Sequence, residues 1–165
     1  VAGAKEKNQN QIAFFTTAIK IVKEHLANWD KLQLEPWYIS AIPVALQRYG
    51  QFIGVKEEQF CVLHIGLTTS YCVHINKNLT VGSSSINWGN SQLIAALEVE
   101  TVNKLAEVNF LQLKKNKKKS LIACCQELQV ALEKIVASFN LKQPLPLLVT
   151  GQIDLMGNFS EYILT

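Results

Sequence analysis

Aspartate is scarce in this sequence, in which Asp30 and Asp154 are the only two examples. Carboxylate oxygens are the ligands that Mg²⁺ prefers, and aspartate often serves phosphoryl transfer as a base or a metal ligand. No ordered Ser-His-Asp series, and no Cys-His pair with an orienting group, offsets this shortage. We therefore expect neither a catalytic residue nor a metal site in this chain.

Long apolar runs are also missing. Segments such as Phe60–Leu63 and Leu145–Val149 fall far short of the ~20 residues that a membrane-spanning helix requires. The chain begins at Val1 with neither an initiator methionine nor a secretory signal, so we expect a fragment of a longer polypeptide. Its 165 residues suffice for one domain, and we interpret 1–165 as a single lobe.

Cysteine occurs without any Cys-x-x-Cys spacing, at Cys61, Cys72, Cys124 and Cys125. The first two fall in predicted core strands, and the adjacent pair falls in a predicted helix. We expect all four to be buried reduced thiols, which favours a reducing compartment over a disulfide framework.

Apolar side chains at three- and four-residue steps predict helices with one buried face. Asn90 or Ser91 is expected to cap one of them, which continues toward the lysine-rich segment. Ser40 or Pro43 is expected to mark the first turn of another. The helices are predicted over 11–28, 37–49, from Asn90 onward, 120–140 and after Leu155.

Alternating or continuous apolar residues predict strands. Three consecutive strands form an antiparallel meander, in which Asn76 and Asn78 tolerate the left-handed backbone of a tight hairpin. The predicted strands are Lys31–Glu35, Phe60–Ile65, Ser70–Ile75, Leu79–Ile86 and Leu147–Thr150. The sequence therefore predicts an α/β fold with a mixed sheet and flanking helices.

Positive charge is concentrated in one segment of the chain. Five lysines fall within six positions, at Lys114, Lys115, Lys117, Lys118 and Lys119. Such a run repels itself, and we interpret it as a solvated loop. The alternative is a contact with an anionic membrane surface. Nucleic acid is not expected, because no aromatic residues are interleaved with the lysines.

The order of these motifs resembles the second lobe of the PilM and GspL families, actin-like cytoplasmic proteins of type IV pilus and type II secretion machines. The resemblance rests first on a strand end with a lysine at Val1–Lys5, followed by a strand at Leu32–Pro36 and a helix at Ala41–Tyr49. Three turns complete it: one like a phosphate-binding loop at Val62–Ser70, a glycine turn at Ile86–Ser91 and one like an adenosine-binding turn at Val149–Gln152. It implies an actin-like, ribonuclease H-like lobe.

The same resemblance implies which residues would face a nucleotide, because glycines and small hydroxyls at strand ends offer N–H and O–H donors to phosphate. The alternative is an ordinary hairpin in which the hydroxyls bond their own backbone. The candidates are Gly66, Thr68, Thr69, Ser70, Gly89, Asn90, Thr150 and Gly151.

Several residues depart from the family pattern. His64 stands where the family has aspartate, and a neutral imidazole is a poor ligand for Mg²⁺. Leu67 and Trp88 add bulk beside glycines that would approach a phosphate, and Gln152 replaces the second adenosine glycine. His64 itself is interpreted as a core residue and His74 as part of a polar strand face.

These departures favour a non-catalytic scaffold with a degenerate nucleotide site that binds ATP weakly or not at all. The resemblance implies a cytoplasmic location, peripheral to or tethered at the inner membrane, and protein partners in a secretion or pilus platform. The alternative is an active ATPase, or a sugar or acyl kinase of the same superfold, whose catalytic aspartate lies in a missing segment.

Overall fold

The computed structural model describes residues 16–36, 39–108, 112–141 and 143–151. The chain divides into two compact units, Val1–Ala41 and Ile42–Thr165. The predicted opening at Val1–Lys5, the predicted helix after Leu155 and Gln152 all lie outside the described residues.

The first unit contains one helix, α1 (Ile19–Lys31), among its described residues. This confirms the predicted helix from Ile19 onward, although the helix continues past Asn28. Its predicted apolar face is half-buried at Val22 and Leu26 and exposed at Ile19.

The predicted strand Lys31–Glu35 is wrong. Lys31 ends α1, and the N–H groups of Leu32, Gln33 and Leu34 bond back to carbonyls of its last turn. Gln33 has a φ of 54°, which closes the turn in the left-handed region. Two leucines at alternating positions resemble a strand in sequence, but both are exposed here.

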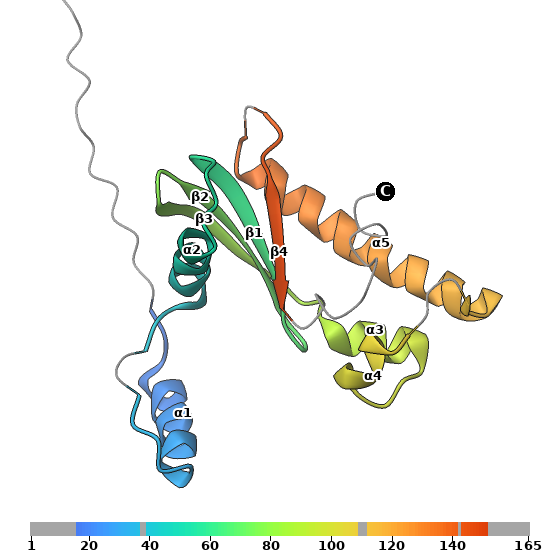
Figure 1. The fold of residues 1–165 in the computed structure, drawn as a ribbon, viewed down its shortest axis with the longest axis horizontal. Helices are drawn as coiled ribbons and strands as arrows, with labels where there is room; N and C mark the ends of the chain where they lie inside the picture. The colour runs from blue at the N-terminus through green and yellow to red at the C-terminus, as the bar shows by residue number, and fades with distance from the viewer. Residues whose placement is uncertain (1–15, 37–38, 109–111, 142, 152–165) are drawn as a thin grey trace, which may run out of the picture. The chain divides into compact units, whose positions relative to one another are not determined.

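The second unit is built on a four-stranded mixed sheet in the order β3-β2-β1-β4 (Figure 1). The strands are β1 (Gln59–Ile65), β2 (Ser70–Asn76), β3 (Leu79–Ile86) and β4 (Leu147–Gly151). The first three form the predicted antiparallel meander, and β4 pairs in parallel with β1. The predicted α/β class and mixed sheet are therefore confirmed.

The β2–β3 hairpin closes through a two-residue turn. Lys77 and Asn78 have φ angles of 48° and 61°, as the favoured hairpin turn requires at both positions. The prediction is thus right for Asn78 and wrong for Asn76, which ends β2 and pairs with Leu79.

One face of the sheet carries the larger hydrophobic core, under α3 (Asn90–Leu97), α4 (Val102–Ala106) and α5 (Lys115–Ser138). Figure 1 shows α5 running along this side. The core includes Leu63, Ile65 and Cys72 from the sheet and Leu121, Cys124 and Leu128 from α5. Burial of such side chains is the main driving force that holds the layers together.

The opposite face packs against α2 (Ile42–Phe52). Leu46 of α2 lies in a smaller core with Phe60, Val62, Val73 and Ile75 of the strands. Pro43 lies in the first turn of α2, where proline is tolerated, as the sequence predicts. The helix starts at Ile42, later than the predicted range, whose residues 37–38 are not described.

The lysine-rich segment is helical, so its interpretation as a loop is wrong. Lys114 is the N-cap residue of α5, and the helix begins at Lys115. Lysine is a good helix former. Lys117 also donates from Nζ to the carbonyl oxygen of Leu97 at 2.7 Å and pairs with Glu98 at 3.3 Å, which ties this end of α5 to the end of α3.

The helix predicted after Asn90 is broken into two. Its predicted apolar residues Leu93, Leu97 and Leu105 are buried, but Glu98 takes a φ of 54° and ends α3. Gly89 is the N-cap residue, so neither Asn90 nor Ser91 has the predicted capping role.

The cysteines are free thiols, as predicted, with three buried and Cys125 half-buried. Within the described ranges, no helix is long and apolar enough to cross a membrane.

Candidate functional site

The carboxyl ends of β1 and β4 lie side by side. In the parallel pairing His64 is opposite Thr150, and Ile65 is opposite Gly151. The turn after β1 and the turn after β4 therefore start at the same edge of the sheet. Ser70 opens β2 opposite Ile65, so the hydroxyl-rich turn lies at this edge as well.

Three glycines allow the backbone segments to approach one another here. A Cβ on Gly89 would lie 2.6 Å from the carbonyl oxygens of Gly66 and Leu67. A Cβ on Gly151, whose φ is +117°, would lie 2.3 Å from the carbonyl oxygen of Ile65. These separations are too short for any side chain. The glycines therefore serve contacts within the chain, whatever else approaches them.

The N-terminus of α3 is hydrogen-bonded to the turn after β1. The backbone N–H of Asn90 donates to Gly66 at 2.9 Å, and that of Ser91 donates to Leu67 at 2.8 Å. The N–H of Gly89 donates to Oε1 of Gln92 at 2.9 Å. These are the donors that a helix start offers to an anion. Each already has an acceptor inside the protein.

Ser70 and Trp88 extend this internal network. The buried hydroxyl of Ser70 donates to the carbonyl oxygen of Trp88 at 2.6 Å. The indole N–H of Trp88 donates to the carbonyl oxygen of Cys124 at 3.0 Å, and the residue is 3% exposed. The bulk of Trp88 thus points into the core, which corrects the expectation that it crowds the glycine turn.

The remaining candidates differ in exposure. Thr68 is exposed, and Thr69 and Thr150 are half-buried. Asn90 is buried, and its Oδ1 has no hydrogen-bond partner among the described residues. All eight residues predicted from the sequence lie around this one edge, and their role toward a nucleotide stays a prediction.

His64 is half-buried in β1, next to this edge. Burial lowers its pKa below the ordinary value of 6.5, because a buried imidazole is less well solvated when charged. His64 is therefore a neutral side chain at pH ~7, in the position where the resemblance implies a carboxylate. Within the described ranges, no group of three or more His, Cys, Asp or Glu side chains has the geometry to hold a metal ion.

His74 is not on a polar face, contrary to the prediction. It is 8% exposed, and its ring centroid lies 5.7 Å from that of Phe139 beyond the end of α5. Side chains do alternate along β2, but both faces of this strand are covered, so alternation does not separate polar from buried positions.

Comparisons with known proteins agree on the fold. The chain is similar to ethanolamine utilization protein EutJ from Carboxydothermus hydrogenoformans, with 18% identity, a TM-score of 0.56 and coverage of 73% of this chain and 44% of that one. It is also similar to a chain of a PilM-PilN type IV pilus biogenesis complex, with 17% identity, a TM-score of 0.59 and coverage of 86% and 44%.

No protein-family model matches the chain, and no curated protein matches it. The chain spans less than half the length of each of these two chains. Both structures have the actin-like fold, so the predicted actin-like architecture is confirmed.

Sequence reasoning missed two features of the site. The link from Trp88 to Cys124 crosses 36 positions, and no local pattern marks it. The acceptors for the α3 N-terminus are backbone carbonyls, which any residue supplies. The one available signal was a tryptophan directly before a glycine and a helix start. It suggested that the side chain obstructs the glycine turn, not that it bonds α5.

Proposed function

We propose that this chain is a non-catalytic scaffold of a bacterial type IV pilus or type II secretion apparatus, with a degenerate nucleotide site. The observation that carries the proposal is the internal hydrogen bonding of the α3 N-terminus to Gly66 and Leu67. Binding a phosphate through these N–H groups would first require breaking bonds that the protein already makes.

The chemistry of His64 supports the same proposal. Phosphoryl transfer depends on Mg²⁺ and a group that orients the nucleophile. A neutral, half-buried imidazole supplies no negative charge for the metal. An actin-like lobe that keeps its shape without this carboxylate is suited to docking other proteins.

The partners we propose are protein components of the inner-membrane platform. One of the similar structures is a complex of PilM with PilN, and by analogy this chain would dock such a component at the cytoplasmic face. Co-purification of the tagged protein from its native cells, followed by mass spectrometry, tests this. Recovery of pilus or secretion platform proteins supports the scaffold, and their absence from intact membranes and extracts counts against it.

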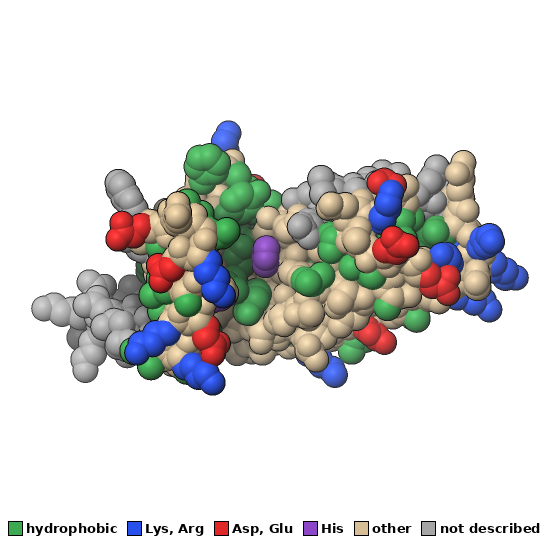
Figure 2. Space-filling view, turned by 90° about the horizontal axis from the view of Figure 1, so that it is seen from below, with side chains coloured by type: hydrophobic (Ala, Val, Ile, Leu, Met, Phe, Trp, Pro, Cys, Tyr) green, Lys and Arg blue, Asp and Glu red, His purple; other side chains and the backbone are tan. Residues whose placement is uncertain are grey.

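Anionic membrane is a further proposed contact, through the exposed lysines at the start of α5. Figure 2 shows blue Lys and Arg side chains on the side where α5 begins, with red Asp and Glu side chains beside them. Lys117 is already paired with Glu98, so the exposed Lys114, Lys115, Lys118 and Lys119 remain for the membrane. Vesicle sedimentation of the wild type and of Lys118→Glu at low salt tests the contact.

The alternative function is an active ATPase or kinase of the same superfold. Gly66, Gly89 and Gly151 still meet at one sheet edge, with the hydroxyls of Thr68 and Thr69 in the same turn. In this alternative a catalytic aspartate comes from another part of the protein, and the three glycines let the backbone approach a bound phosphate.

ATP turnover by the protein separates the two functions. The scaffold predicts no Mg²⁺-dependent release of phosphate above that of a heat-denatured sample, both for the wild type and after His64→Asp. Turnover by the wild type that requires Mg²⁺ rejects the scaffold and supports the alternative. Turnover only after His64→Asp would show an otherwise intact site that lacks one carboxylate, and would reject the claim that internal hydrogen bonds close it.

A further inference from the structure

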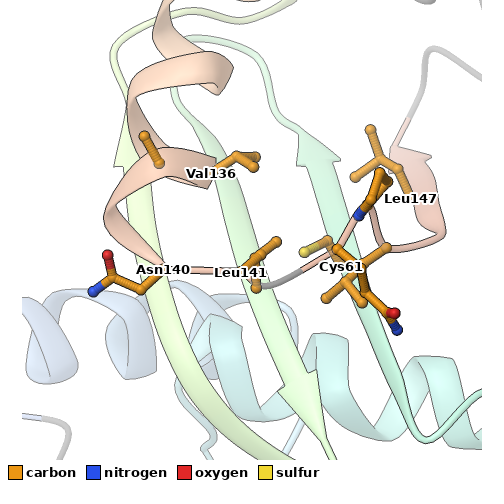
Figure 3. Close-up of a pocket in the computed structure, with 9 residues that line it drawn as sticks. Cys61, Val136, Asn140, Leu141 and Leu147 are labelled. Atoms are coloured by element: carbon orange, nitrogen blue, oxygen red, sulfur yellow. The ribbon is translucent and has the colours of Figure 1, made fainter.

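A cavity of about 690 Å³ lies at the end of α5, away from the glycine turns. Its walls include Val136 and Ala137 of α5, Leu145 before β4, Leu147 at the start of β4, and Cys61 near the start of β1. Figure 3 shows Cys61 and Leu147 on one side of the cavity and the end of α5 on the other. Small-molecule sites in proteins usually measure about 300 to 1,000 Å³.

A second hollow of about 410 Å³ adjoins the first. The two share Asn140, Leu141, Gln143 and Leu145 as walls, and the second adds Gln59, His74 and Phe139. We call the two hollows together the α5 pocket. One part of it is mainly apolar, and the other carries amide side chains and an imidazole.

His74 lines the second hollow and has a ring nitrogen without a partner among the described residues. The side chain is 8% exposed, and Nε2 is buried with no hydrogen-bond partner in the described part of the chain. Phe139 covers the ring at a centroid distance of 5.7 Å. Phe139 can occupy this position because Gly82 has no side chain. A Cβ on Gly82 would lie 2.9 Å from the Phe139 ring.

An unpartnered buried nitrogen is costly, so proteins usually give such an atom a partner. Burial also lowers the pKa of His74, so the imidazole is neutral and offers a hydrogen bond but no charge. Among the described lining residues none is charged at neutral pH. These described walls offer no charge to compensate a charged ligand for the hydration that it would lose.

We propose that the α5 pocket binds a small uncharged molecule with an apolar body and one hydroxyl or N–H group. The apolar body fills the part lined by Val136, Ala137 and Leu147, and the polar group lies in the part lined by His74. Because Nε2 is buried, the imidazole turns toward the hollow to accept the hydrogen bond from this group. This site lies at the opposite end of β1 from Gly66, and the proposal does not depend on the proposed function.

A matched pair of fluorescent probes tests the proposal. N-phenylnaphthylamine is uncharged, apolar and carries one N–H, and anilinonaphthalene sulfonate has the same rings with an added sulfonate. We expect saturable binding of the uncharged probe, and at least about tenfold weaker binding of the sulfonate because its charge would be desolvated. Equal binding of both probes, or no saturable binding of the uncharged one, overturns the proposal.

Two variants locate the probe. Ala137→Trp fills the apolar part and should weaken binding at least tenfold by the exclusion of volume, whereas Ala123→Trp on the exposed side of the same helix should not. His74→Phe keeps an aromatic ring but removes the nitrogen, and should weaken binding about fivefold, as expected for a neutral hydrogen bond. Binding that is unchanged in Ala137→Trp places the probe elsewhere and rejects the pocket. Binding that is unchanged in His74→Phe rejects the role of His74.

Alkylation of Cys61 gives an independent readout of position. Iodoacetamide alkylates the thiolate. Cys61 lines the pocket and is 4% exposed, and a hydrogen bond from the Cys72 thiol lowers its pKa whereas burial raises it. The uncharged probe should slow alkylation of Cys61 and leave Cys125, on α5 outside the pocket walls, unaffected. Equal protection of both thiols indicates a general effect on the fold and contradicts a site at Cys61.

Discussion

The backbone N–H of Asn90 donates to the carbonyl oxygen of Gly66 across 2.9 Å and joins the start of α3 to the turn after β1. Ser91 and Leu67 make a parallel bond at 2.8 Å. A helix N-terminus attracts anions because its first N–H groups lack partners. Here those groups are satisfied within the chain, and this is the physical basis for proposing a scaffold rather than a nucleotide-processing enzyme.

Gly151→Ala should destabilise the protein strongly. The new Cβ would lie 2.3 Å from the carbonyl oxygen of Ile65 at a φ of +117°, so both the clash and the backbone strain oppose folding. We expect a loss of about 3 kcal/mol or more in the free energy of unfolding, measured by urea denaturation.

Gly54→Ala is the matched control. Gly54 also has a positive φ, +76°, but no atom lies within 4 Å of the place that a Cβ would take. Its expected cost is about 1 kcal/mol from strain alone. Similar losses in the two variants would mean that close packing at the glycine turns is not what requires Gly151.

Ser70→Ala should remove the link between the start of β2 and the segment before α3. The hydroxyl of Ser70 is fully buried and bonds the carbonyl oxygen of Trp88 at 2.6 Å. Loss of the donor leaves that carbonyl unpaired, at a cost of about 1 to 3 kcal/mol in unfolding free energy. Ser85→Ala on the exposed side of β3 should change stability by less than about 0.5 kcal/mol, and an equal effect of both substitutions argues against the bond.

Much of the second unit could be predicted from its sequence. The bounds predicted for β3 match the structure, and those of β1, β2 and β4 differ by one residue at one end. These strands combine apolar runs with turn residues, so local pattern and tertiary structure agree. The segment Lys31–Glu35 has a similar pattern but pairs with no strand among the described residues, and it forms the end of a helix and a turn instead.

Features that depend on distant contacts could not be predicted. His74 is buried because Phe139 lies 65 positions along the chain and covers it. The lysine-rich segment is helical with Lys117 held by the end of α3, whereas charge alone suggested a loop. Both errors come from judging a residue by its immediate neighbours when a remote element determines its environment.

Lys117→Met should weaken the connection between α3 and α5. Its Nζ donates to the carbonyl oxygen of Leu97 at 2.7 Å and pairs with Glu98 at 3.3 Å. Leu97 ends α3, so its carbonyl oxygen has no partner within that helix. We expect a loss of about 1 to 2 kcal/mol in thermal or urea unfolding, because a charged donor is lost from a part-buried site. Lys118→Met removes the same charge from an exposed position and should have little effect. Equal losses would show that charge, not this contact, determines the result.

The protein should lose stability as the pH falls from about 7 to about 5. Burial lowers the pKa values of His64 and His74 below 6.5 in the folded state, so the unfolded chain binds protons first. Stability is then full above the unfolded pKa and falls below it, with a slope of at most about 1.4 kcal/mol per pH unit for each histidine.

His74→Phe should flatten this pH dependence, since it removes one of the two groups. Urea denaturation of both proteins across the pH range measures the slopes. Parallel curves for wild type and variant would mean that His74 titrates alike in the folded and unfolded states, against the burial seen here.

Amide NMR of the protein during titration with Mg²⁺ and ATP shows whether the N-terminus of α3 is closed to phosphate. We expect the N–H groups of Gly89, Asn90 and Ser91 to exchange slowly with solvent and their signals not to shift as nucleotide is added, because Gln92, Gly66 and Leu67 already accept their hydrogen bonds. Saturable, Mg²⁺-dependent shifts at these three amides would show that phosphate displaces the internal acceptors, and would rule out a scaffold with a closed site.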